Sequence, residues 1–89
     1  MGKEVSGDMR FCTTAGIADR MEQSEEFKQF VHDSLSRHLS RDWGDISADD
    51  ADYNNTNPGN ALSAYILDGA KIWIKQDGDI ITVLFPDEY

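Results

Sequence analysis

The strongest hydrophobic pattern in the chain lies between residues 24 and 40. Its apolar positions recur with a period close to 3.6, which is typical of one face of an α-helix. They are Phe27, Phe30, Val31, Leu35, His38 and Leu39. Ser24 is a favoured N-cap residue, and Gly44 follows shortly after the last turn, as glycine often does beyond a helix. We therefore predict a helix over Ser24–Ser40.

The segment before this helix shows weaker signals. Ile17 and Met21 are four residues apart, a spacing that places them on one face of a short helix over Ala15–Glu22. Met9–Thr14 contains an aromatic residue and two threonines, which indicates a short edge strand.

The segment after it begins with Ser47, a good N-cap residue for a further helix. We predict this helix over Ala48–Asn54, with Ala51 and Tyr53 facing inward.

The last third of the chain has the pattern of β-strands. Three runs rich in β-branched and aromatic residues are separated by two Asp-Gly pairs, which favour type I′ hairpin turns. The runs are Ala61–Leu67, Ala70–Lys75 and Ile80–Phe85. They predict an antiparallel meander of three strands.

Together these elements predict an α+β fold with N-terminal helices packed on one face of the C-terminal three-stranded meander. Residues 9–89 are expected to form one domain that follows a flexible tail over residues 1–8. Alternation along the middle strand places Ile72 and Ile74 on one sheet face and Trp73 on the other.

Composition restricts the possible partners. The 89 residues include eight basic and seventeen acidic side chains, which give a net charge of −9, and 39% are hydrophobic. Such a chain can fold, but its charge repels phosphate, so we expect no direct nucleic-acid binding and no attachment to anionic membranes. Cys12 stands alone and the start of the chain has no secretory pattern, so we expect a cytoplasmic protein.

The negative charge is concentrated in the second half of the chain. Residues 1–41 carry a net charge of −1, and residues 42–89 carry −8. Five aspartates fall within eleven residues: Asp42, Asp45, Asp49, Asp50 and Asp52. They act either as a solubilising surface or as a face that docks a basic protein surface.

A metal site in this segment is the competing interpretation. Asp50 begins a string that resembles the start of a calcium loop, but Asn55 and Ala61 occupy the positions that require Gly and Glu. His32 and His38 are six residues apart, which places them on different helix faces. We expect no catalytic, cofactor-binding or metal site. A small metal-dependent enzyme or metal-binding protein that uses the Asp-rich segment and His38 stays as the alternative.

The two tryptophans are candidate contact residues. Trp43 either closes the core at the end of the long helix or anchors an interface. Trp73 lies on the opposite sheet face from Ile72 and Ile74, so one of these two sets must lie on the less covered face. If that face is the one with Trp73, it would suit a partner protein or a homodimer contact.

Four strings, taken in order, resemble a family of small bacterial proteins of unknown function that are often carried on plasmids, phages and other mobile elements. They are Arg41–Asp45, Ala61–Tyr65, Lys71–Ile74 and Thr82–Tyr89, and the resemblance spans residues 11–89. This chain has Arg41 where the family pattern has Gly. The resemblance implies a compact domain of mobile-element origin and supplies no catalytic residue.

The sequence therefore predicts a small, acidic, non-enzymatic protein-binding module. Its partner surface would comprise Asp42, Asp45, Asp49, Asp50, Asp52, Trp43 and Trp73. An accessory or anti-defence role, in which the acidic face blocks a nucleic-acid-binding surface of a host protein, agrees with the resemblance. A homodimer formed through the sheet face is a further alternative.

Overall fold

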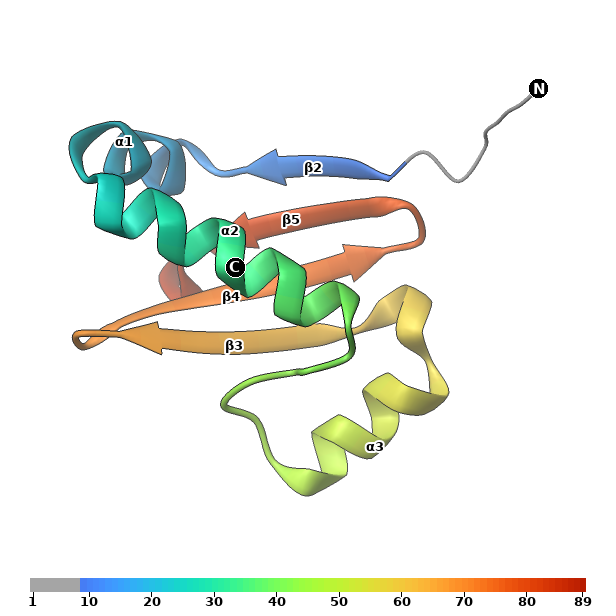
Figure 1. Ribbon diagram of the computed structural model, residues 1–89. Coiled ribbons are helices and arrows are strands. Elements are labelled where there is room, and N and C mark those ends of the chain that lie inside the picture. Colours follow the sequence, from blue (N-terminus) through green and yellow to red (C-terminus); the bar gives the residue numbers. More distant parts are fainter. Residues whose placement is uncertain (1–8) are drawn as a thin grey trace.

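The computed structural model describes residues 9–89, in which helices cover one face of a β-sheet (Figure 1). The described helices are α1 (Ala15–Gln23), α2 (Glu25–Leu39) and α3 (Ala48–Thr56), with short 3₁₀ turns at Pro58–Asn60 and Pro86–Glu88. The described strands are β2 (Arg10–Thr13), β3 (Leu62–Leu67), β4 (Ala70–Asp77) and β5 (Ile80–Leu84). The predicted α+β class is confirmed, whereas the predicted tail over residues 1–8 lies outside the described residues.

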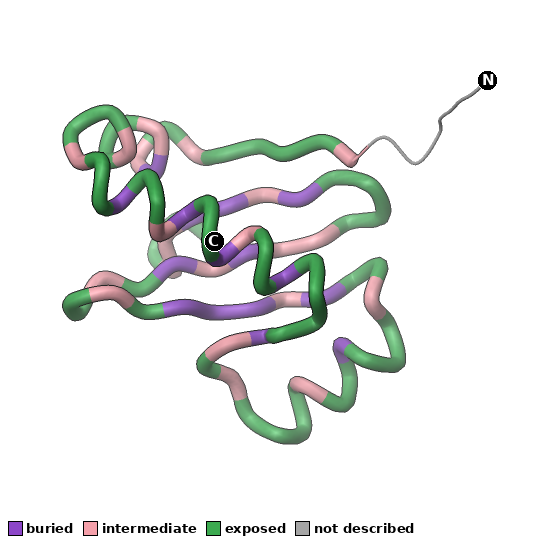
Figure 2. Tube along the Cα trace, viewed as in Figure 1, coloured by how far each residue is buried: buried purple, intermediate pink, exposed green. Residues whose placement is uncertain are grey.

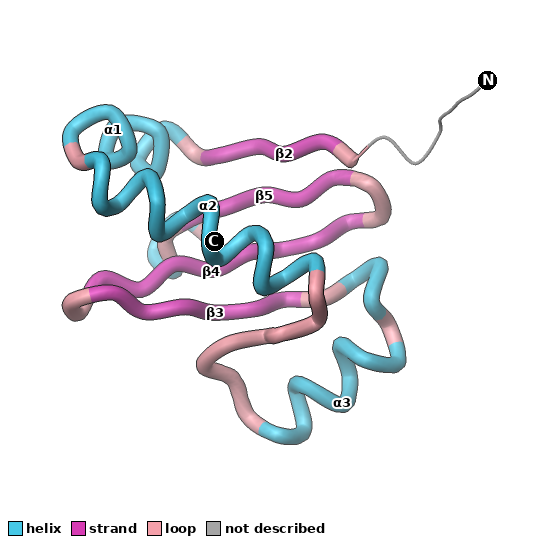
Figure 3. Tube along the Cα trace, in the orientation of Figure 1, coloured by secondary structure: helices cyan, strands magenta, loops and turns pink. Residues whose placement is uncertain are grey.

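The sheet is four-stranded and mixed, with the order β2-β5-β4-β3 (Figure 3). Strands β3, β4 and β5 form the predicted antiparallel meander, but β2 adds a fourth strand that runs parallel to β5. The prediction of a three-stranded antiparallel sheet is therefore wrong in this detail. β2 pairs with β5, which lies near the other end of the chain, so no turn signal in the sequence predicts this pairing.

The two hairpin turns differ in type. Asp68 and Gly69 both have positive φ, as a type I′ turn requires. The second turn has a positive φ only at Gly78, and β4 already ends at Asp77, so this turn has the pattern of type II′. The predicted type I′ turn at the second Asp-Gly pair is wrong.

Helix α2 is rotated slightly from the predicted orientation. Its buried residues are Phe27, Val31, Ser34 and His38. Leu39, which was predicted to lie on the apolar stripe, has 52% of its surface exposed. Ser34, a polar residue that the predicted stripe did not include, is buried instead. Figure 2 shows the buried positions on α2 and on β3, β4 and β5, while β2 is exposed throughout.

Helix α3 lies beyond the outer edge of β3, and its orientation differs from the prediction (Figure 1). Asn54 is buried, whereas Tyr53, which was predicted to face inward, is 49% exposed. The Asn54 side-chain amide donates to the Leu62 carbonyl at 2.9 Å and accepts from the Leu62 N–H at 3.3 Å. A polar side chain is buried here because it pairs both backbone groups of an edge-strand residue.

None of the helices within residues 9–89 is long and apolar enough to cross a membrane.

Candidate functional site

The loop between α2 and α3 is held in place by Asp42. Its carboxylate accepts two hydrogen bonds from Arg37, at 2.7 Å from Nε and 3.2 Å from the second guanidinium nitrogen. These bonds lower the pKa of Asp42 below its usual value and raise that of Arg37. The Asp42 carbonyl also accepts from the Tyr65 hydroxyl at 2.7 Å, and burial raises the pKa of Tyr65 to about 12. Asp42 is therefore occupied within the chain, and we remove it from the partner surface predicted from sequence.

Trp43 closes the core rather than anchoring an interface. Its side chain is only 6% exposed, and its ring packs edge-on against His38 with 5.1 Å between the centroids. The indole N–H donates to the side-chain carbonyl of Asn55 at 2.9 Å, so α3 is fastened to the loop through this residue. Of the two roles considered for Trp43, its burial agrees with closure of the core, and we leave it out of the proposed partner surface.

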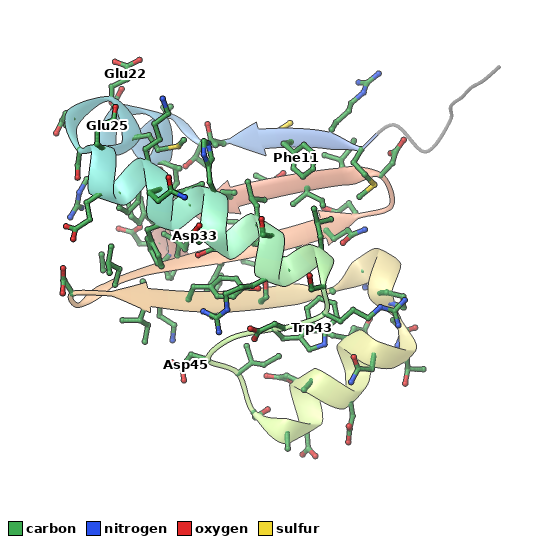
Figure 4. The ribbon with its side chains drawn as sticks, in the orientation of Figure 1. Phe11, Glu22, Glu25, Asp33, Trp43 and Asp45 are labelled. Carbon is green, nitrogen blue, oxygen red and sulfur yellow. The ribbon has the colours of Figure 1, made fainter. Side chains whose placement is uncertain are left out.

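The next residues of the loop extend along the edge of β3. The Trp43 carbonyl accepts from the Ala64 N–H at 3.2 Å, and the Asp45 N–H donates to the Ala64 carbonyl at 2.7 Å. This bridge satisfies the β3 edge and directs Asp45 away from the core, as Figure 4 shows for Trp43 and Asp45.

Four of the five predicted aspartates form what we call the acidic shelf: Asp45, Asp49, Asp50 and Asp52. All four are exposed. The ion pairs found within residues 9–89 are Arg37–Asp42 and Lys75–Asp77, so none of them neutralises the acidic shelf. The charges of the shelf are therefore available to a cation from outside the described part of the chain.

The acidic shelf borders a cavity of about 260 Å³ on the sheet face that the helices leave uncovered. Asp45 and Asp50 line it on one side, and Leu62, Lys71 and Trp73 line it from the sheet. The structure thus brings together two of the predicted aspartates and the predicted Trp73. Leu62 and Lys71 were not predicted, although the strand alternation places both on the same face as Trp73.

Trp73 is half-buried in this position. Tyr89 packs edge-on against its ring, with 5.6 Å between the centroids and 74° between the planes. Carboxylates beside an aromatic and aliphatic floor suit a lysine or arginine side chain, whose stem is apolar and whose head is cationic.

A second polar cluster lies inside the core around His38. Gln76 donates its amide N–H to the Gly78 carbonyl at 3.0 Å, which leaves its Oε1 to accept from His38 Nε2 at 2.9 Å. Neutral His38 therefore carries its proton on Nε2, and its Nδ1 accepts from the Ser63 hydroxyl at 2.7 Å. The sequence places His38 on the apolar stripe of this helix, but it does not identify Ser63 or Gln76 as its partners.

This serine–histidine pair has the separation of a nucleophile and its base, but both side chains are enclosed. Ser63 has no exposed surface and His38 is 1% exposed, so a substrate cannot reach the hydroxyl in this conformation. The cluster holds α2 on the sheet. His32 is exposed, on another side of the helix from His38, as its spacing predicted.

The described residues also offer little to the metal-dependent alternative. Asp50 and Asp52 lie on helix α3, whereas a calcium loop requires a loop at these positions. Within residues 9–89, no three His, Cys, Asp or Glu side chains converge so that they could hold a metal ion.

Burial of His38 predicts a loss of stability in mild acid. Desolvation lowers its pKa below the usual 6.5, so below about pH 6.5 the unfolded chain takes up a proton that the folded chain does not. The free energy of unfolding should therefore fall as the pH decreases from 7.5 to 5. Urea titrations at a series of pH values measure this slope.

The matched comparison uses the two histidines of α2. In His38→Gln the slope between pH 7.5 and 5 should largely disappear, whatever the cost of the substitution at pH 7.5. His32→Gln, which removes an exposed histidine, should leave the slope unchanged. An undiminished slope in His38→Gln would contradict the assignment.

No protein-family model, curated protein or solved structure matches this chain.

Proposed function

We propose that the protein is a non-enzymatic binding module whose acidic shelf docks a basic surface of another protein. The observation that carries this proposal is the cavity at which Asp45 and Asp50 meet Trp73. Asp45 and Asp50 form no ion pair within residues 9–89, although Lys71 lines the same cavity. Together with the half-buried ring of Trp73 they provide the contacts that a lysine or arginine side chain needs. The remaining shelf residues, Asp49 and Asp52, extend the negative potential along α3.

The charge distribution supports a protein partner rather than a nucleic acid. The net charge of −8 over residues 42–89 repels phosphate and attracts surfaces rich in lysine and arginine. Surfaces that bind nucleic acid are rich in these residues, so an acidic module competes for them. A mobile-element accessory that blocks a nucleic-acid-binding surface of a host protein follows from this chemistry together with the sequence resemblance.

The proposal predicts salt-sensitive binding of a fluorescently labelled oligoarginine peptide. Wild-type affinity should fall as salt rises, because screening acts over about 8 Å at physiological ionic strength. Asp45→Asn combined with Asp50→Asn should weaken binding roughly tenfold, as expected from the loss of two partly solvated ion pairs. Fluorescence anisotropy at several salt concentrations measures both effects.

The control variant removes two aspartates from the hairpin turns. Asp68→Asn combined with Asp79→Asn changes the net charge by the same amount and leaves the cavity intact. Its affinity should fall much less than that of the shelf variant. Equal losses in the two variants would show that only net charge matters and would overturn the assignment of a site.

A third variant tests the aromatic part of the site. Trp73→Ala should weaken binding of oligoarginine more than of oligolysine, because the planar guanidinium stacks on aromatic rings. An unchanged affinity for both peptides would remove Trp73 from the site.

A further inference from the structure

Among the strands of residues 9–89, none pairs with the outer edge of β2, which lies at the side of the sheet opposite the acidic shelf. The Arg10 N–H donates to the Asp79 carbonyl at 2.7 Å, and the Thr14 N–H donates to the Val83 carbonyl at 3.1 Å. In a parallel ladder, alternate residues turn toward the same neighbour, so Arg10, Cys12 and Thr14 bond to β5. The backbone groups of Phe11 and Thr13 therefore point outward, and no other strand within residues 9–89 pairs with them.

An apolar side chain stands at this edge. Phe11 lies on the helix-covered face of the sheet and is 52% exposed. Figure 4 shows it on β2, at the far side of the molecule from Asp45. A half-exposed phenylalanine beside unpaired backbone groups marks a surface that favours a further strand.

A cavity of about 410 Å³ opens two residues further along the same strand. It lies between β2, α1 and α2, and its lining includes Thr13, Ala18 and Met21, with Glu22, Glu25 and Lys28 at the remaining sides. Phe11 and this cavity therefore lie on the same face of the sheet, next to the same strand edge.

We propose that the occupant of this edge is a second copy of the chain, paired antiparallel through β2. In a two-fold symmetric dimer, every contact between a residue of one copy and a residue of the other occurs twice. When Cys12 lies on the two-fold axis, Phe11 forms a hydrogen-bonded pair with Thr13 of the partner subunit. By symmetry, Thr13 forms the same pair with Phe11 of the partner subunit. Each Phe11 ring then stands beside the cavity at the partner's Thr13, and both unpaired edges are satisfied.

The charges on the other face of the sheet agree with this register. Arg10 comes to lie opposite Thr14 of the partner subunit. In each chain the Thr14 hydroxyl donates to Glu88 Oε1 at 2.6 Å, so a carboxylate stands beside the position that Arg10 reaches. Two ion pairs related by the symmetry axis therefore complement the strand pairing.

The long-range charges also favour this edge over the others. The sheet order places β2 at the opposite edge from β3, beside which α3 and the acidic shelf lie (Figure 1). Residues 9–41 contain five acidic and five basic side chains, so the edge has little net charge to repel a second copy. The dimer would hold two acidic shelves at its outer ends, which suits a partner with repeated basic sites.

Cys12 makes the register testable without adding a probe. Opposed residues of a non-hydrogen-bonded antiparallel pair have Cα atoms about 4.5 Å apart, within the range of a disulfide. Mild oxidation of the exposed native Cys12 should therefore give a covalent dimer at protein concentrations where the chain associates. Non-reducing electrophoresis measures the product, and light scattering measures the reversible dimer.

The matched control moves the thiol by one strand. Thr82 pairs with Cys12 in the sheet and lies on the same face. In Cys12→Ser combined with Thr82→Cys, the two thiols would be separated by three strand spacings, about 14 Å, so oxidation should give no dimer. Equal cross-linking through both positions would indicate random collision and would overturn the register.

Two edge variants test the contacts themselves. Thr13→Pro removes an N–H that β5 does not use, so circular dichroism should show the fold retained while the dimer dissociates. Phe11→Ala should raise the dimer dissociation constant roughly thirtyfold, as expected for a buried aromatic anchor. Dimerisation that survives both changes would overturn the proposal.

Other occupants of the edge give different results. A wild-type chain that stays monomeric at all concentrations overturns the proposal. If such a chain dimerises only after residues 1–8 are removed, that segment occupies the edge instead. None of these outcomes alters the affinity of the acidic shelf for oligoarginine, so the two proposals fail independently.

Discussion

Gly44→Ala should reduce the free energy of unfolding by about 2–5 kcal/mol, although it adds a single methyl group. Gly44 has a φ of +75°, a conformation that costs an L-residue roughly 1–2 kcal/mol. A Cβ atom there would also press on the Ala64 carbonyl oxygen and approach the Tyr65 ring to 2.7 Å. Crowding of this kind in a packed region adds about 1–3 kcal/mol. Urea denaturation followed by tryptophan fluorescence measures the change.

Gly69→Ala separates the two causes. Gly69 has a similar φ of +82°, but no atom lies within 4 Å of the position that its Cβ would take. This substitution should cost only the conformational part, about 1–2 kcal/mol. Equal losses at the two positions would mean that the loop at Gly44 moves away from β3 without penalty.

The same substitution links the fold to the proposed site. Gly44 is the point at which the loop comes closest to β3, and the next residue, Asp45, lines the cavity of the acidic shelf. A displaced loop carries Asp45 away from Trp73. Gly44→Ala should therefore weaken oligoarginine binding under conditions where the variant is still folded, whereas Gly69→Ala should not.

Local signals in the sequence were sufficient for most elements of the fold. Ser24 caps α2 through its side chain, and Ser47 caps α3 in the same way, as their positions predicted. The Asp68-Gly69 pair forms the predicted turn between β3 and β4. In each case the interacting groups lie within a few residues of one another, so the pattern of neighbouring residues specifies the structure.

Long-range pairing was not predictable in the same way. Strand β2 has four exposed residues and no alternation that would identify its partner or its direction. The buried face of α2 includes Ser34, a polar residue that the predicted apolar stripe left out. His38 is buried because Ser63 and Gln76, both distant in sequence, satisfy its ring nitrogens.

The candidate site also combines features that local sequence predicts with features that depend on long-range contacts. The run of aspartates is visible in the sequence, but Arg37 removes Asp42 from it through an ion pair that the helix end creates. Asp45 lines the same cavity as Asp50 and Trp73 because the loop is bridged to β3 at Gly44. A bridge of this kind has no sequence signal beyond Gly44, whose conformation permits it.

The second large effect is expected for Phe27→Ala, at about 3–5 kcal/mol. Phe27 is 4% exposed, and its ring packs against Phe30 and Phe85 with centroid separations of 5.8 and 6.0 Å. Removing it leaves a cavity between α2 and the sheet. For a domain of this size the loss is a large share of the total stability, so the thermal midpoint should fall by many degrees.

Phe30→Ala is the matched comparison on the same helix. Sequence periodicity gave Phe30 equal weight, but its side chain is only partly buried at the margin of the core, so its removal should cost clearly less. If Phe27→Ala does not fold, Phe27→Leu, which keeps most of the apolar volume, should still melt cooperatively. Its thermal midpoint should lie below that of Phe30→Ala, because Phe27 is the more buried of the two residues. A Phe30→Ala variant that is as unstable as Phe27→Ala would show that Phe30 contributes to the core as much as Phe27, as the predicted stripe implied, rather than lying at its margin.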